Sequence, residues 1–388
     1  MDLSQIRKES VRQIKQLRSA SVNQLTRIRN ASASQISRIR NASSGQISRI
    51  RSISAKQLTR IRRQSAGQIS RIRSLSSEQL DRLREITASK PFTRMNEIPC
   101  GQASDKITEG CLVLEGGAFR GLYSQGVLDA LMENDINFRC VIGVSAGALS
   151  GLNYCSGQIG RSARINLGYR HDSRYVGIQA LRKSHSIVNL DFILKDVNEF
   201  EPFNHKYFDN PQRQFVAVVA NVNTGKAEYM EKSSCPDIMD AAKASASMPY
   251  VSPFVMINDQ PYLDGGTSCK IAYQWAIDQG FEKIVVVRTR TRDFRKKPMG
   301  KENELADFFY RRHPQFAKAL RESNINYNRQ CDELIKLEKQ GRVYVIAPKQ
   351  QVKVSRVESD VEKLGDLYFE GYREMNEGIG ELRSYLEK

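Results

Sequence analysis

The sequence predicts an α/β domain with a mainly parallel sheet, preceded by one long helix built from 11-residue repeats. Two observations predict the domain. Apolar runs of strand length end in clusters of small residues, and a helical pattern follows each cluster, as in residues 111–131 and 140–149. A third observation predicts the helix, because a strict period of eleven runs through residues 1–90, which contain no proline. The 388 residues suffice for one large domain or two ordinary ones besides this segment.

A glutamine marks each repeat unit, at positions 13, 24, 35, 46, 57, 68 and 79. Eleven residues over three turns is about 3.67 residues per turn, so a nearly straight helix keeps each repeat position on one face. Ile and Leu form a narrow apolar stripe on that face, and arginines such as Arg38 and Arg40 lie on its two flanks. We therefore predict that residues 1–87 form an amphipathic helix that lies on an anionic membrane surface.

The positive charge belongs to this segment. The whole chain has a net charge of +17, and residues 1–90 hold 20 Lys or Arg against 5 Asp or Glu, which gives +15. Any anionic partner is therefore expected there. Two alternatives stay open for the repeat. The first is a homo-oligomeric coiled coil, which would bring like-charged arginines together. The second is binding of nucleic acid or an acidic protein, and nucleic acid is not expected because the segment has no aromatic residue for base stacking.

The hydropathy of the chain and its cysteines predict where the protein resides and whether it binds a metal. No run of about 18 uncharged apolar residues occurs, and the first residues lack the apolar segment of a signal peptide. We therefore expect a cytoplasmic protein that associates peripherally with membranes. The seven cysteines lack metal-ligand spacing, so we expect reduced thiols, no metal and no cofactor. Residues 88–110 contain two prolines and no periodicity, and we predict a linker there.

The stretch Cys140–Leu149 is expected to be a strand, a tight turn and a helix around Ser145. A serine on a strained strand-to-helix turn needs small neighbours, which Gly143, Ala146 and Gly147 supply. The following helix would direct its first N–H groups toward negative charge that develops beside the hydroxyl. Alone, this pattern is a weak indicator of a nucleophile, because Gly-x-Ser-x-Gly arises by chance in a chain with 25 glycines.

A second strand, glycine loop and helix precede it. The run Leu112-Val113-Leu114 leads into Glu115-Gly116-Gly117-Ala118-Phe119-Arg120-Gly121. Consecutive small residues expose backbone N–H groups that can bind an anion, and Arg120 adds a positive charge. Such a loop suits a phosphate or an oxyanion. A dinucleotide site is disfavoured, because Ala118 occupies the middle glycine position and Asp135 lies in an expected loop.

Further along, Asp264-Gly265-Gly266 follows an apolar run and by itself predicts only a turn. A glycine loop with an arginine, a Gly-x-Ser-x-Gly turn and an Asp-Gly-Gly, in this order and spacing, together resemble the patatin-like phospholipase family. The resemblance covers about residues 110–290. It implies a three-layer patatin-like fold with a mainly parallel sheet. The predicted catalytic domain is 111–292, and residues 293–388 look like the helical extension of bacterial members.

The resemblance also implies roles for individual residues. Ser145 would be the nucleophile and Asp264 its partner. The oxyanion-hole loop would comprise Gly116, Gly117, Ala118, Arg120 and Gly121, with Arg120 supporting it. Ala118 departs from the third glycine usual in the family. Its N–H can still serve, provided that this position does not need a positive φ.

The chemistry implied is ester hydrolysis without histidine, in which a carboxylate takes the serine proton directly. A Ser-His-Asp triad is the competitor. Of the four histidines, only His313 follows Asp264, and it stands in a basic helix end. We therefore expect a phospholipase A or lysophospholipase that acts on phospholipids or lysophospholipids through an acyl-Ser145 intermediate. In the alternative hypothesis the repeat is a membrane-coating or oligomerising scaffold, and the patatin-like domain is regulatory.

Overall fold

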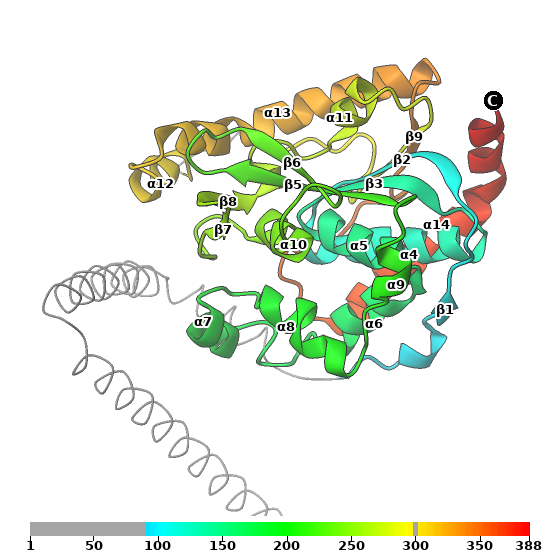
Figure 1. Cartoon of the computed structure of the whole chain (residues 1–388), viewed down its shortest axis with the longest axis horizontal. Coiled ribbons are helices and arrows are strands. Elements are labelled where there is room, and N and C mark those ends of the chain that lie inside the picture. Colours follow the sequence, from blue (N-terminus) through cyan, green and yellow to red (C-terminus); the bar gives the residue numbers. More distant parts are fainter. Residues whose placement is uncertain (1–90, 298–301) are drawn as a thin grey trace, which may run out of the picture. The chain divides into compact units, whose positions relative to one another are not determined.

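The computed structural model describes residues 91–297 and 302–388, so the helix predicted over residues 1–87 lies outside the described residues. The described part contains an 8-stranded sheet (Figure 1). Its strands are β2 (Thr108–Leu114), β3 (Phe138–Val144), β5 (Gln214–Asn221), β6 (Ala227–Glu231), β7 (Val255–Ile257), β8 (Gln260–Asp264), β9 (Ile284–Val287) and β10 (Tyr344–Ile346). A separate pair joins β1 (Gly101–Gln102) to β4 (Gln158–Ile159).

The α-helices are α4 (Gly121–Glu133), α5 (Ala146–Cys155), α6 (Arg161–Gly168), α7 (Ile178–Ser184), α8 (Leu190–Leu194), α9 (His205–Phe208), α10 (Ile238–Ala246), α11 (Tyr273–Asp278), α12 (Glu302–Phe309), α13 (Pro314–Lys339) and α14 (Val361–Glu387). Short 3-10 turns are η1 (Met95–Glu97), η2 (Ala118–Arg120), η3 (Asp196–Glu199) and η4 (Gly265–Thr267). The sheet order is β10-β9-β2-β3-β5-β8-β7, with β6 paired to β5. From β10 to β5 every pairing is parallel, which confirms the predicted α/β class with a mainly parallel sheet.

Helices cover both faces of this sheet. In Figure 1, α11 and α13 lie over one face, and α4, α5, α10 and α14 lie over the other. Val113, Ile142 and Val286 of neighbouring strands pack in one buried cluster with Trp275 of α11 and Tyr327 of α13. Because these parallel strands are buried on both faces, their sequences read as continuous apolar runs rather than alternating ones.

The helix α14 packs directly on α4, and the two backbones touch. A Cβ on Gly126 of α4 would collide with the Tyr368 carbonyl, and a Cβ on Gly371 of α14 would collide with the Tyr123 carbonyl. The Tyr368 hydroxyl donates a 2.8 Å hydrogen bond to the buried Asp129 carboxylate. The last helix of the chain therefore fixes α4, which begins directly after the glycine loop.

Two strands meet end to end beside β5. β3 runs parallel to β5 as far as the pair Val144–Val218, and β8 runs antiparallel to it and ends at the pair Asp264–Val219. Because β6 pairs with 216–220 on one side of β5, β3 and β8 share its other side. Ser145 comes directly after the last residue of β3, and Asp264 is the last residue of β8. The register of β5 brings these two residues together.

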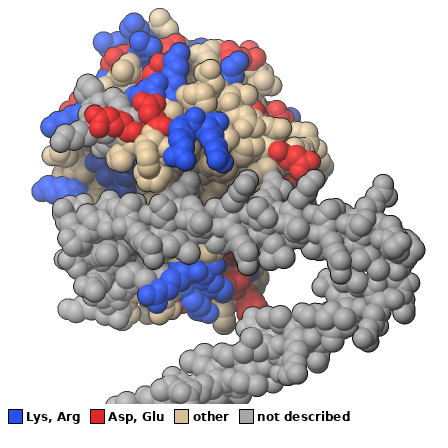
Figure 2. Space-filling view, turned by 90° about the vertical axis from the view of Figure 1, so that its left-hand side faces the viewer, with Lys and Arg blue, Asp and Glu red and all other residues tan. Residues whose placement is uncertain are grey.

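The predicted linker and C-terminal extension both contain strands. β1 and the first residues of β2 lie within 88–110, and β10 within 293–388 forms an edge of the main sheet beside β9. The face in Figure 2 shows basic and acidic side chains interspersed with other residues. No helix of the described ranges has both the length and the apolarity to span a membrane.

Candidate active site

Ser145 occupies a strained turn between β3 and α5. Its φ is 57° and its ψ is −125°, a conformation that favours glycine and that a serine adopts only at a cost of roughly 1–3 kcal/mol. The turn is so tight that only glycine fits at two positions. A Cβ on Gly143 would overlap the Gly147 and Ala148 backbone, and a Cβ on Gly147 would overlap the Leu114 carbonyl. The expected need for small residues around Ser145 therefore has a direct steric cause at Gly143 and Gly147.

The Ser145 hydroxyl donates a 2.6 Å hydrogen bond to Oδ2 of Asp264. The other oxygen of this carboxylate accepts the Gly266 N–H at 2.7 Å, and the Asp264 N–H donates to the Ser247 carbonyl at 2.8 Å. Both side chains are nearly enclosed, since Ser145 is 8% and Asp264 is 7% exposed. The structure thus brings the two predicted residues together and orients the carboxylate toward the hydroxyl.

Burial raises the pKa of Asp264 above its ordinary value. The hydrogen bonds from Ser145 and Gly266 and the charges of Lys270 and Arg356 act in the opposite direction and offset only part of this rise. A carboxylate with a raised pKa is a stronger base than an ordinary aspartate. It is therefore better suited to remove a proton from a hydroxyl.

Ser245 of α10 holds the turn in place and was not found by sequence reasoning. Its hydroxyl accepts the Ser145 N–H at 2.9 Å and donates to the Val218 carbonyl at 2.6 Å. Ser245 is fully buried. It lies in a run of small residues that also contains Ser247, and no motif in the sequence marks it.

The glycine loop lies against the Ser145 turn. A Cβ on Gly116 would come within 2.8 Å of the Val144 carbonyl oxygen and 2.9 Å of the Ser145 Cβ. Within residues 91–297 and 302–388, no acceptor receives a hydrogen bond from the N–H of Gly116, Gly117 or Ala118. Because Gly116 lies against Ser145 and these three N–H groups have no acceptor there, they are the candidate donors to an oxyanion.

Ala118 has a φ of 50°. The proviso that this position does not need a positive φ is thus not met. Alanine nevertheless adopts the left-handed conformation, at a cost of about 1 kcal/mol, and so can still present its N–H. The loop keeps this shape because its surroundings hold it, as the contacts of Arg120 and Phe119 show.

Arg120 and Gly121 do not offer free backbone donors. The Gly121 N–H donates to carbonyls of the preceding turn, and the Arg120 N–H donates to Gly117. The Arg120 side chain extends to the Val354 carbonyl, which accepts from Nε at 2.9 Å. Both residues therefore contribute to the shape of the loop through these bonds rather than as free donors.

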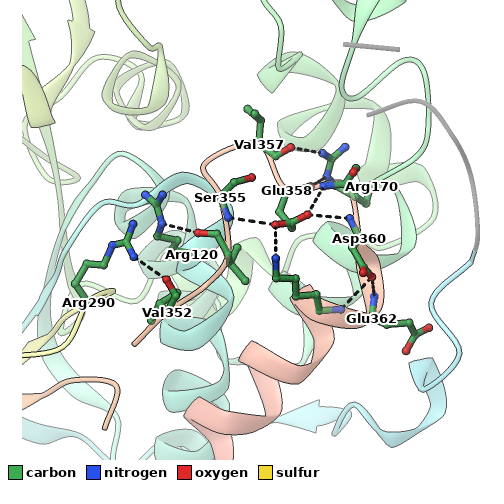
Figure 3. Close-up of polar contacts among 12 residues, drawn as sticks. Arg120, Arg170, Arg290, Val352, Ser355, Val357, Glu358, Asp360 and Glu362 are labelled. Carbon is green, nitrogen blue, oxygen red and sulfur yellow. Dashed lines mark hydrogen bonds and ion pairs between the residues drawn. The ribbon is translucent and has the colours of Figure 1, made fainter. Parts of the chain in front are cut away.

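Residues 347–360, which link β10 to α14, are named the C-terminal strap below. Three arginines bind its backbone carbonyls rather than its side chains (Figure 3). These bonds run from Arg290 to Val352 at 2.8 Å, from Arg120 to Val354 at 2.9 Å, and from Arg170 to Val357 at 3.1 Å and Glu358 at 2.6 Å. The Phe119 N–H also approaches the Arg356 carbonyl, at 3.5 Å.

Arg170 joins the strap to the glycine loop. Its guanidinium lies 4.5 Å from the centre of the Phe119 ring while it binds the two strap carbonyls. The side chain is fully buried, and burial lowers its pKa to about 10. The loop that faces Ser145 is thus fastened to the C-terminal region at Phe119 and at Arg120.

The histidine of the competing triad lies elsewhere. His313 precedes α13, and its ring packs against Phe254, with ring centres 5.6 Å apart. Burial lowers the pKa of His313. Among the described residues, no group of three or more His, Cys, Asp or Glu is placed to hold a metal ion.

Comparison with known proteins agrees with this geometry. Residues 112–272 match the family model described as patatin-like phospholipase. The chain contains a patatin-like phospholipase domain. This confirms the resemblance inferred from the three motifs, because the matched residues include the glycine loop, Ser145 and Asp264. Residues 313–387 match a second model, described as a domain of unknown function, which includes the C-terminal strap.

Two curated proteins are similar to part of this chain. The Escherichia coli (strain K12) protein named "Uncharacterized protein YjjU" is 27% identical over 192 residues, which cover 46% of this chain and 51% of that protein. The "Probable lipid hydrolase 463L" of Invertebrate iridescent virus 6 is 28% identical over 173 residues, which cover 40% of this chain and 59% of that protein. The chain thus spans little more than half the length of either relative.

Among solved structures, VipD from Legionella pneumophila has a TM-score of 0.35 and 13% sequence identity, over 74% of this chain and 69% of that one.

The strain at Ala118 leads to a paired prediction. Ala118→Gly should leave the free energy of unfolding unchanged or raise it by up to about 1 kcal/mol, because relief of the positive φ outweighs the added chain entropy. Gly116→Ala should lower it by about 1–3 kcal/mol, because its methyl meets the Val144 backbone. Urea unfolding of both variants measures this. Equal losses in the two variants would contradict the conformations assigned to the loop.

Proposed function

We propose that this chain is a serine lipid acyl hydrolase in which Ser145 and Asp264 form a catalytic dyad. The observation that carries the proposal is the 2.6 Å hydrogen bond from the Ser145 hydroxyl to Asp264, at a strained turn against which Gly116 of the glycine loop packs. A nucleophile, a base and oxyanion donors are the parts that acyl transfer requires.

In the proposed mechanism the Ser145 oxygen attacks the ester carbonyl carbon and its proton passes to Asp264. The carbonyl oxygen becomes an oxyanion that the N–H groups of Gly116, Gly117 and Ala118 stabilise. The tetrahedral intermediate expels the alcohol, which receives the proton from Asp264, and an acyl-Ser145 ester remains. A water molecule then attacks this ester, gives its proton to Asp264 and releases the fatty acid as Ser145 is restored.

We propose phospholipids or lysophospholipids as substrates. The patatin-like phospholipase domain and a relative named as a probable lipid hydrolase support this substrate class. The dyad does not depend on a histidine, so ester hydrolysis would rest on the raised basicity of Asp264 and on the oxyanion donors.

We further propose that residues 1–87 hold the enzyme at anionic membranes. Phospholipids are insoluble, and residues 1–90 carry a charge of +15 on a pattern with an apolar stripe. Lys and Arg near an anionic surface contribute about 1 kcal/mol each to membrane binding. The same pattern keeps the alternative of a membrane-coating or oligomerising scaffold open, with the patatin-like domain as regulator.

Removal of either dyad residue tests the enzyme proposal. Ser145→Ala and Asp264→Asn should each lower the release of fatty acid from phospholipid by about 10³-fold or more, because each removes an essential group. Mass spectrometry of the products on mixed lipids would also give the acyl position. Ser156→Ala, at the far end of α5, is the matched control and should retain activity. Full activity in Ser145→Ala, or no activity of the wild type on any ester, would contradict the proposal.

A charge variant of the repeat tests the membrane proposal. Glutamine in place of Arg38, Arg40, Arg49, Arg51, Arg60 and Arg62 keeps the length and lowers the charge by six. We expect this variant to bind vesicles of phosphatidylglycerol at least tenfold more weakly than the wild type in sedimentation at low salt. Vesicles of phosphatidylcholine serve as the control. Equal binding to anionic vesicles would exclude the electrostatic anchor, and a large lipid-free assembly in light scattering would favour the scaffold.

A further inference from the structure

Five basic side chains from four loops are close enough to act on one another electrostatically, and two of them, Lys270 and Arg356, also act on Asp264 of the dyad. They are Arg120, Lys270, Arg290, Lys296 and Arg356. Arg120 follows β2, Arg290 and Lys296 follow β9, and Arg356 follows β10. The carboxyl ends of these parallel strands lie at one edge of the sheet. Lys270 follows β8 and η4, and its ammonium donates to the Gly266 carbonyl, next to the Asp264 carboxylate.

The strap and the sheet hold these cations without neutralising them. Arg120 and Arg290 each donate to one strap carbonyl, Val354 and Val352, which are neutral partners (Figure 3). The Lys296 ammonium lies 4.3 Å from the centre of the Tyr327 ring. Each guanidinium has five N–H donors, so most of them stay available beside these contacts. Arg356 is exposed at the turn of the strap.

Few negative charges face this cluster. Within the described ranges, the carboxylates that act on it electrostatically are those of Asp264 and Glu115. Glu115 is already engaged, because its Oε2 lies 3.7 Å from Arg288 and accepts the Thr289 N–H at 2.8 Å. Asp264 serves Ser145. The five basic groups thus outnumber the carboxylates near them.

The lowered pKa values of three of these basic groups agree with the excess of basic over acidic groups. Burial and the neighbouring positive charges lower the pKa of Lys296 to about 6 and that of Lys270 to about 8. Burial and the charges of Arg290 and Arg356 lower the pKa of Arg120 to about 10. Like charges that are held together in a partly desolvated place repel one another and favour the neutral form of Lys296. A bound anion would remove this repulsion and restore the charge of Lys296.

We propose that Arg120, Lys270, Arg290, Lys296 and Arg356 form an anion-binding subsite that takes the phosphate of an anionic phospholipid headgroup. The inference rests on the proposed function, because it is the hydrolysed lipid that brings the phosphate to this place. Only a few bonds separate the phosphate of a glycerophospholipid from its acyl esters. An ester carbonyl at Ser145 therefore leaves the phosphate near the cluster at the same edge of the sheet.

The charge of the subsite sets a preference among headgroups. Phosphatidylglycerol carries one negative charge, whereas phosphatidylcholine adds an ammonium that the positive charges of the subsite repel. Arg290 and Lys296 lie outside the residues that match the patatin-like model, and Arg356 lies in the second matched region. The headgroup preference would therefore be set mainly by the C-terminal part of this chain.

Hydrolysis in mixed micelles of a neutral detergent tests the subsite, because a large excess of detergent keeps the surface charge constant. The wild-type full chain should have a kcat/KM for phosphatidylglycerol at least about tenfold above that for phosphatidylcholine. Lys296→Met with Arg356→Gln should lower this ratio to between one and three. Lys353→Met, an exposed lysine of the strap outside the cluster, should keep the wild-type ratio. A ratio near one in the wild type, or an unchanged ratio in the double variant, would overturn the subsite.

Binding separates this inference from the proposed function. Full-length Ser145→Ala should bind dihexanoyl-phosphatidylglycerol in calorimetry at least tenfold more tightly than dihexanoyl-phosphatidylcholine, with no turnover needed. Such binding without any hydrolysis by the wild type would refute the enzyme and keep the subsite. Hydrolysis without any headgroup preference would keep the enzyme proposal and refute the subsite. Inorganic phosphate alone should bind far more weakly than the lipid, and equal affinity would assign the subsite to a free ion and overturn the lipid proposal.

Discussion

The candidate active site depends on one constraint of strand pairing, which is that β3 and β8 share one side of β5. The pairs Val144–Val218 and Asp264–Val219 are consecutive along β5, so the end of a parallel strand meets the end of an antiparallel one. This meeting sets the 2.6 Å hydrogen bond between Ser145 and Asp264, which lie 119 positions apart in the sequence. Ser245 strengthens it, because its hydroxyl joins the Ser145 backbone to the Val218 carbonyl of β5. A shift of β8 by one residue would turn the Asp264 side chain to the other face of the sheet.

The second constraint comes from the C-terminal region, which supports the glycine loop from two directions. The helix α14 fixes α4 through backbone contact at Gly126 and Gly371, and the strap binds Arg120 and Phe119 of the loop itself. An alanine with positive φ at position 118 is held in this loop. In the proposed enzyme the region that matches a domain of unknown function would therefore position the oxyanion donors and, through Arg356, also contact the headgroup.

The sequence predicted those features that leave a local pattern. Buried parallel strands read as apolar runs, and the turn at Ser145 requires the glycines at 143 and 147, so both were visible before the structure. Asp264 was found only through the family resemblance, because Asp-Gly-Gly alone indicates a turn. The strap contacts could not be predicted, because the arginines bind its backbone carbonyls. Every residue type carries the same backbone carbonyl, so these contacts leave no signal in the sequence. Ser245 and the convergence of Lys296 with Arg356 depend on tertiary packing and likewise leave no pattern.

The central claim is that Asp264 removes the proton of Ser145 directly. The most direct test is the rate at which an alkyl fluorophosphonate labels the full-length protein as a function of pH, with the modified residue located by mass spectrometry. Labelling forms the Ser145 oxygen–phosphorus bond, releases fluoride and requires the ionised form of Asp264. Because burial raises the pKa of Asp264, we predict labelling at Ser145 alone, at a rate that falls with decreasing pH at values above the ordinary aspartate range of about 4. Asp264→Asn should label slowly and lose this pH dependence. Labelling of Ser145 at the wild-type rate in Asp264→Asn would contradict the account.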